Sequence, residues 1–125
     1  MRKIYKMIAF FSIAMLMSFA SKDCSILKNN SFTYRTGGED VLVVFEESKH
    51  AEYHNDNEFY IKSDIEWISD CEYYLTVTET TLPNFPFEMG AKLHIIINKV
   101  KGEKVYYTSS LGGKSWEGRL TMVKE

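Results

Sequence analysis

The stretch EWISDCEYYLTVTET, residues 66–80, decides the fold because its side chains alternate between two faces as they do in a β-strand. From Cys71 onward, the odd positions continue with Tyr73, Leu75 and Val77, whereas glutamate, tyrosine and threonine occupy the even positions. A period of two is typical of a strand with one buried face. We therefore predict a half-buried strand whose odd positions, Cys71 included, face the interior.

Similar runs recur along the chain and are separated by turn residues. They are SFTYRT (31–36), DVLVVFEESK (40–49), FYIK (59–62), IEWI (65–68), AKLHIIINKV (91–100), EKVYYTSS (103–110) and SWEGRLTMV (115–123). Strands joined by short turns usually pair with their sequence neighbours, which predicts an all-β antiparallel meander of about seven or eight strands. Closure removes exposed edges, so we expect a small up-and-down barrel or a bent half-barrel, with a two-sheet sandwich as the alternative.

Two interruptions shape this expectation. HAEYHNDNE, residues 50–58, is polar and contains three consecutive turn-forming residues, so we interpret it as a connection. Ser63 and Asp64 separate FYIK from IEWI as a turn or kink.

His50, His54 and Asp56 are residue types that bind zinc, but solvated loops have the same composition. We predict no metal site and no cofactor.

The first twenty residues have the pattern of a secretory signal. Three basic residues precede an uncharged apolar stretch from Met7 to Ala20, and small residues occupy the positions that a signal peptidase reads. The stretch is shorter than the roughly 20 apolar residues that span a bilayer. We predict a signal helix cleaved after Ala20, a single all-β domain over 21–125 and no membrane span after cleavage. An uncleaved anchor and lipid attachment at Cys24 are the alternatives.

The predicted mature chain is acidic. Residues 1–20 contain three of the 15 basic residues and none of the 17 acidic ones, so 12 basic against 17 acidic residues give a net charge of −5. Binding to nucleic acid depends largely on clustered lysine and arginine, so this balance disfavours it. We expect an exported monomer, either periplasmic or extracellular.

Export also bears on the two cysteines, Cys24 and Cys71, which both remain after cleavage. Two thiols in one small domain most simply pair in an oxidising compartment. A bridge would close a loop of about 48 residues and stabilise the fold by roughly 4 kcal/mol. We predict this disulfide, with two free thiols or a metal pair as the alternatives.

Aromatic residues recur at strand positions and suggest where a ligand would bind. One interpretation is that they fill the core; the other is that some of them line a cavity at one mouth of a barrel. On the second interpretation, the candidate ligand-binding residues are Tyr60, Trp67, Tyr73, Tyr107 and Trp116.

The segment TLPNFPFEMG, residues 81–90, is unusually apolar for a connection, and its two prolines argue against a central strand. Leu82, Phe85, Phe87 and Met89 either plug one end of the barrel or form a contact surface for an envelope protein.

The sequence contains no recognisable catalytic motif. The chain has no nucleophile-elbow pattern, and alternation places Glu46, Glu66 and Glu72 outward. We predict a non-catalytic exported protein that binds a small apolar or amphipathic ligand. The alternative is an envelope-associated structural or interaction domain with a filled core.

Two resemblances accompany this prediction. Phe32, together with the core Trp67, Asp70, Cys71, Tyr73 and Leu75, resembles a group of small exported β-rich proteins of Gram-negative bacteria that has no established activity. The order of strands is also similar to that of lipocalin-like barrels, in which an early Gly-x-Trp packs beneath a late arginine. Arg119 would match that arginine, and Phe32 would replace the tryptophan.

Overall fold

The computed structural model describes residues 23–124 and contains eight antiparallel strands in one closed barrel. The predicted signal peptide lies outside the described residues. A short 3-10 helix, η1 (Ser25–Leu27), precedes the strands. These are β1 (Ser31–Thr36), β2 (Glu39–Phe45), β3 (Lys49–His54), β4 (Phe59–Ser69), β5 (Glu72–Thr80), β6 (Lys92–Lys101), β7 (Lys104–Leu111) and β8 (Lys114–Met122).

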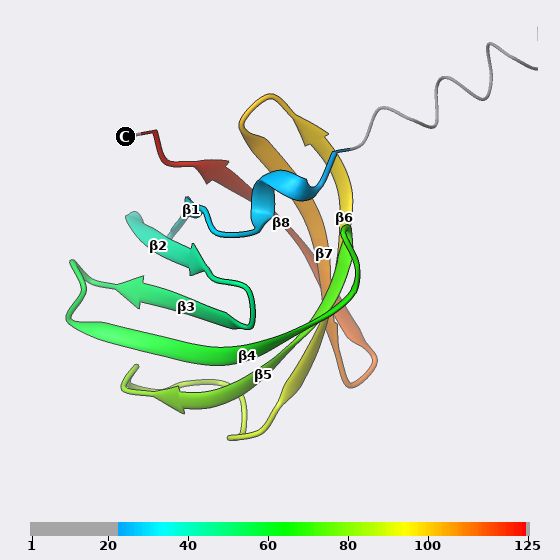
Figure 1. Cartoon of the computed structure of the whole chain (residues 1–125). Helices are drawn as coiled ribbons and strands as arrows, with labels where there is room; N and C mark the ends of the chain where they lie inside the picture. Colours follow the sequence, from blue (N-terminus) through cyan, green and yellow to red (C-terminus); the bar gives the residue numbers. More distant parts are fainter. Residues whose placement is uncertain (1–22, 125) are drawn as a thin grey trace, which may run out of the picture.

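Each strand pairs with the next one in sequence, and β1 closes the barrel against β8 (Figure 1). The closing register joins Phe32 to Met122, and the backbone N–H of Val123 donates to the carbonyl of Ser31 at 2.9 Å. The predicted up-and-down barrel is confirmed, and the sandwich alternative is wrong because the terminal strands satisfy one another's edges.

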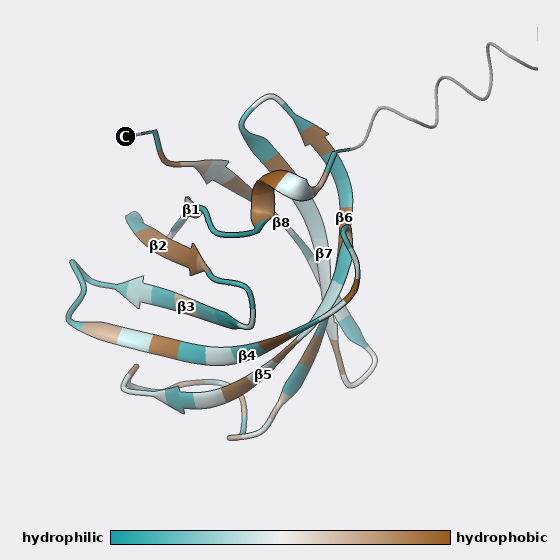
Figure 2. Ribbon diagram, in the orientation of Figure 1, coloured by the Kyte–Doolittle hydropathy of each residue, from teal (hydrophilic) through white to brown (hydrophobic). Residues whose placement is uncertain are grey.

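The alternation that predicted β5 is confirmed from Tyr73 onward, but Cys71, predicted as part of the same strand, lies in the turn before it. Tyr73, Leu75 and Val77 are buried, whereas the even positions between them face outward or are half-buried. Figure 2 shows the same banding of hydrophilic and hydrophobic residues along the neighbouring β4.

Of the turn or kink predicted at Ser63 and Asp64, the turn is wrong, because β4 runs unbroken from Phe59 to Ser69. A β-bulge lies at this point instead. Lys62 pairs with Glu79 and Ser63 with Val77, so Thr78 on β5 has no partner in the register. Its hydroxyl donates to the carbonyl of Lys62 at 3.2 Å. Such bulges bend a strand and increase its twist, which helps this sheet to close.

The interpretation of residues 50–58 as a connection is wrong in its first half. Lys49–His54 forms β3, paired to β2 on one side and to β4 on the other. The turn is confined to Asn55–Asn57, whose three residues have positive φ angles of 54°, 56° and 68°. Polar composition concealed a strand here because its inward side chains are themselves polar.

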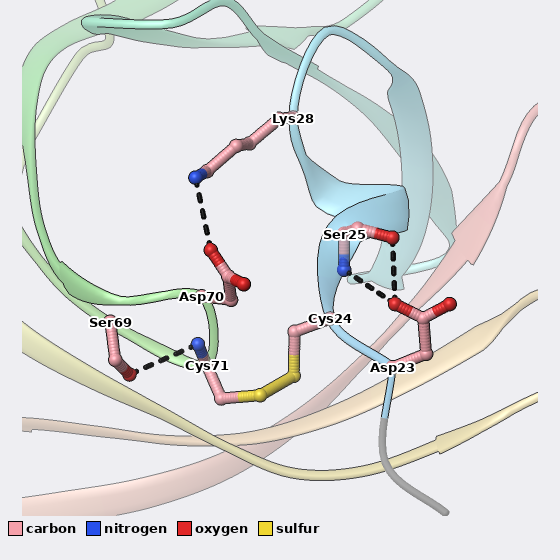
Figure 3. Close-up of a disulfide and its surroundings, with 7 residues drawn as sticks. All are labelled: Asp23, Cys24, Ser25, Lys28, Ser69, Asp70 and Cys71. Carbon is pink, nitrogen blue, oxygen red and sulfur yellow. Dashed lines mark hydrogen bonds and ion pairs between the residues drawn. A yellow bond between two sulfur atoms is a disulfide. The ribbon is translucent and has the colours of Figure 1, made fainter.

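A disulfide closes one end of the barrel (Figure 3). Cys24 and Cys71 are bonded, with their Cα atoms 5.3 Å apart, which confirms the predicted pairing. The bond holds η1 against the barrel, and Leu27 of this helix is fully buried. An exposed ion pair between Lys28 and Asp70, at 3.1 Å, lies beside it. Exposed pairs of this kind add at most about 1 kcal/mol.

Aromatic rings fill the interior of the barrel next to the disulfide. Phe45 makes edge-to-face contacts with Phe32 at 5.6 Å and with Tyr73 at 6.0 Å, and Trp67 lies 4.9 Å from Tyr73. Phe32 and Phe45 are each at most 1% exposed. The half of the barrel next to the disulfide is therefore a packed core.

Candidate functional site

A cavity of about 1010 Å³ occupies the other half of the barrel. Its wall includes the buried residues Val43, Ile95 and Leu120. Its mouth lies at the end opposite the disulfide, where the β1–β2 turn, the β7–β8 turn and the loop between β5 and β6 are found. Figure 1 shows that loop, in yellow-green, far from η1. Its volume lies at the upper end of the range of small-molecule sites, roughly 300–1,000 Å³.

Three polar side chains of β3 face this cavity. His50, Glu52 and His54 alternate along the strand, so all three lie on its inner face and line the cavity. Tyr34, two strands away on β1, donates its hydroxyl to Glu52 Oε1 at 2.6 Å. The same oxygen lies 3.3 Å from His54 Nε2. The arrangement gathers one carboxylate, one phenol and two imidazoles at the cavity wall.

Glu52 carries the negative charge of this cluster. Burial raises its pKa, but the hydrogen bonds with His54 and Tyr34, and the charge that His50 carries when protonated, outweigh burial and leave the pKa below its ordinary value. The side chain is 23% exposed because it faces the cavity. Glu52 is therefore an ionised carboxylate at neutral pH.

His50 is the most enclosed member of the cluster, with 6% of its surface exposed. Burial lowers its pKa, and the nearby charge of Glu52 only partly opposes this effect. Its ring packs edge-to-face on Phe45 at 4.8 Å. Within residues 23–124, its Nδ1 atom has no hydrogen-bond partner. His50 is thus a neutral imidazole that lines the cavity and has one buried nitrogen without a hydrogen-bond partner among the described residues.

Two further tyrosines complete the polar wall. Burial raises the pKa of Tyr107 to about 12, and the charge of Glu52 adds to this effect. Burial likewise raises the pKa of Tyr73, with smaller contributions from Tyr107 and Glu52. Both residues line the cavity. Their hydroxyls stay protonated and can donate hydrogen bonds to a ligand.

The structure brings together three of the five predicted ligand-binding residues. Tyr73, Tyr107 and Trp116 line the cavity. Tyr60 instead faces the outer surface, where its hydroxyl bonds to Glu79 and its ring lies under the Lys62 amine.

Trp67 packs at the disulfide end, away from the cavity mouth. Its Nε1 donates to the carbonyl of Glu47 at 3.0 Å, and the amine of Lys28 lies 4.9 Å from its ring. The aromatic content of the sequence does not distinguish this end of the barrel from the other.

The apolar loop between β5 and β6 lies over the mouth. Leu82, Phe85 and Phe87 line the cavity, whereas Met89 is 55% exposed. Phe87 stacks on Trp116 of β8, with ring centroids 5.9 Å apart and planes 11° from parallel. This contact joins the loop to the barrel rim, so the loop partly covers the entrance.

Sequence reasoning missed Tyr34, Glu52 and the inward direction of both histidines. The signal was present in His50-x-Glu52-x-His54, since residues at every second position share one face of a strand. Asp56, the third member of the zinc interpretation, is exposed in the turn after β3. Among the described residues, no group of three histidine, cysteine, aspartate or glutamate side chains is arranged to hold a metal ion.

Fold and cavity together define the class: a small disulfide-bonded β-barrel that is packed at one end and hollow at the other. A scan against protein-family models finds no matching family, and searches of curated proteins and of solved structures return no match. No helix in the part of the chain that the structure describes is long and apolar enough to cross a membrane. The disulfide is compatible with an exported protein.

Proposed function

We propose that this protein binds a small apolar or amphipathic molecule in the barrel cavity. The observation that carries the proposal is the cavity itself, whose lining combines aliphatic and aromatic side chains with a few converging polar groups. Small-molecule sites typically have this composition. Export through a signal peptide cleaved after Ala20, into the periplasm or the medium, belongs to the same proposal, as does the monomeric state.

The two tryptophans provide a direct test because they lie at opposite ends. Trp116 stands at the mouth against Phe87, whereas Trp67 lies in the packed core beside Tyr73. Titration of a Trp67→Phe variant with decanol should give a saturable change in the fluorescence of Trp116. A Trp116→Phe variant should respond much less, since its remaining tryptophan is remote from the mouth.

A blocking variant serves as the control. Ser109 is 3% exposed and lines the cavity, so Ser109→Phe places a ring in the ligand space. In the Trp67→Phe background it should abolish the response while the far-ultraviolet circular dichroism stays that of a β-barrel. If alcohols and fatty acids of several chain lengths all gave a flat titration of the unblocked protein, ligand binding would be refuted.

The alternative is an interaction domain that docks through the loop between β5 and β6, and exposed Met89 favours it. This alternative assumes a filled core, which the cavity argues against. Substituting Met89→Lys should abolish capture of an envelope partner if the loop is the contact surface. The same variant should leave decanol binding unchanged if the cavity is the working site.

A further inference from the structure

We propose, resting on the proposed function, that the ligand carries a positively charged amine, which lies against Glu52 while the apolar part of the ligand points toward the mouth. The cavity wall contains four residues with formally charged side chains, Arg35, Glu52, Glu117 and Arg119. Three of these are exposed, and Glu52 alone of the four is not. The inner part of the cavity is therefore anionic.

Within residues 23–124, no lysine or arginine forms an ion pair with Glu52. Tyr34 contributes a neutral donor, and burial keeps His50 neutral. His54 is 3.3 Å from Glu52 Oε1 and would carry a charge only if protonated. A carboxylate removed from water needs either a cation or several hydrogen bonds.

The second carboxylate oxygen has capacity to spare. Tyr34 and His54 both contact Oε1, and Oε2 accepts no hydrogen bond from the described residues. An ammonium group has three N–H donors and no acceptor, so it suits an acceptor-only carboxylate oxygen.

The surrounding rings are suited to the same head group and to its chain. Tyr73, Tyr107 and Tyr34 line the inner cavity, and Phe85, Phe87 and Trp116 line its mouth. Aromatic faces attract cations, by about 0.5–2 kcal/mol per contact, and they also accept aliphatic chains. An amphiphile with its amine at Glu52 and its alkyl chain between the mouth residues would use both parts of the cavity.

Three probes with one alkyl chain separate head-group preference from chain binding: decylamine, decanoate and decanol. Each is titrated at pH 7.4 in 150 mM salt, below its micelle concentration, with Trp116 fluorescence of the Trp67→Phe variant as the readout. Decylamine should bind at least tenfold more tightly than decanoate. Glu52→Gln should weaken decylamine by tenfold or more, while decanol affinity stays within threefold.

A matched control excludes general attraction of cations by the acidic protein. Glu117 lines the mouth but is exposed, so Glu117→Gln should change decylamine affinity by less than threefold. If Glu52→Gln fails to fold, the preference of the unsubstituted site for decylamine over decanoate still tests the amine assignment.

The outcomes are distinguishable. Equal binding of the three probes, tighter binding of decanoate, or an equal loss of all three in Glu52→Gln would overturn the amine assignment and leave the proposed function standing. Absence of binding by every probe would overturn the proposed function and this inference together.

Discussion

Tyr34 of β1 donates its hydroxyl to Glu52 Oε1 of β3 at 2.6 Å, across the intervening strand β2. The bond joins two residues 18 positions apart inside the barrel. Burial raises the pKa of Tyr34, and the charge of Glu52 raises it further, so the phenol remains a donor. This contact joins β1 to β3 and places a neutral donor on the carboxylate of the candidate site.

Removing that donor should destabilise the fold. Tyr34→Phe should lower the free energy of unfolding by about 1.5–3 kcal/mol, the range for hydrogen bonds to charged groups. Urea denaturation followed by circular dichroism measures the change. Tyr60→Phe is the matched control because its hydroxyl bonds to Glu79 on the outer surface, and it should cost less than about 0.5 kcal/mol. Equal losses in the two variants would contradict the buried role of Tyr34.

Buried His50 should make the protein sensitive to mild acid. Its pKa in the folded state lies below the ordinary value of 6.5, so below pH 6.5 the unfolded chain binds more protons and stability falls. The melting temperature should therefore decrease between pH 7.5 and pH 5.0. Glu52 contributes in a lower window, since its lowered pKa loses stability only as the pH falls below about 4.5.

Replacing His50→Leu should flatten this dependence between pH 7.5 and pH 5.0. A nearly neutral effect at pH 7.5, within about 1 kcal/mol, is expected because the substitution removes a buried nitrogen that has no partner. Val43→Ala, a buried change without a titrating group, should lower the melting temperature equally at both pH values. If His50→Leu kept the full acid sensitivity, its titration would not be the cause.

The disulfide should supply a large share of the stability. In a Cys24→Ala, Cys71→Ala double variant we expect a loss of about 4 kcal/mol, because the bridge joins residues 47 positions apart and restricts the unfolded chain. Urea denaturation of the double variant, compared with the oxidised and the reduced wild type, measures it. A midpoint equal to that of the oxidised protein would refute this expectation.

Gly118 is required beneath a tyrosine ring. Tyr107 pairs with Gly118 across β7 and β8, and a Cβ at position 118 would lie 2.4 Å from the Tyr107 ring and hydroxyl. Gly118→Ala should cost about 1–3 kcal/mol by displacing this ring. In a Tyr107→Leu background the cost should fall, so a double-mutant cycle should give a clear coupling energy. Additive effects would mean that the contact does not constrain either residue.

Alternation along the chain predicted the strands, and the need to cover the sheet edges favoured a barrel over a sandwich. The inward side of β5 is apolar at Tyr73, Leu75 and Val77, and a period of two follows directly from strand geometry. The disulfide was also predictable, since the predicted export would leave Cys24 and Cys71 with one obvious partner each. The candidate site was only partly predictable, because aromatic residues serve equally well as core and as cavity wall.

By itself, then, the sequence determined the class of fold, the pairing of the cysteines and the direction of most strand residues, because all three depend on local periodicity or on simple counting. The tertiary structure decided that β3, whose inward positions are polar, is a strand and that Glu52 faces an internal space. Tyr34, two strands away, helps to stabilise this polar inner face by donating a hydrogen bond to the buried carboxylate. That pairing depends on how the sheet curls, which no local pattern in the sequence records.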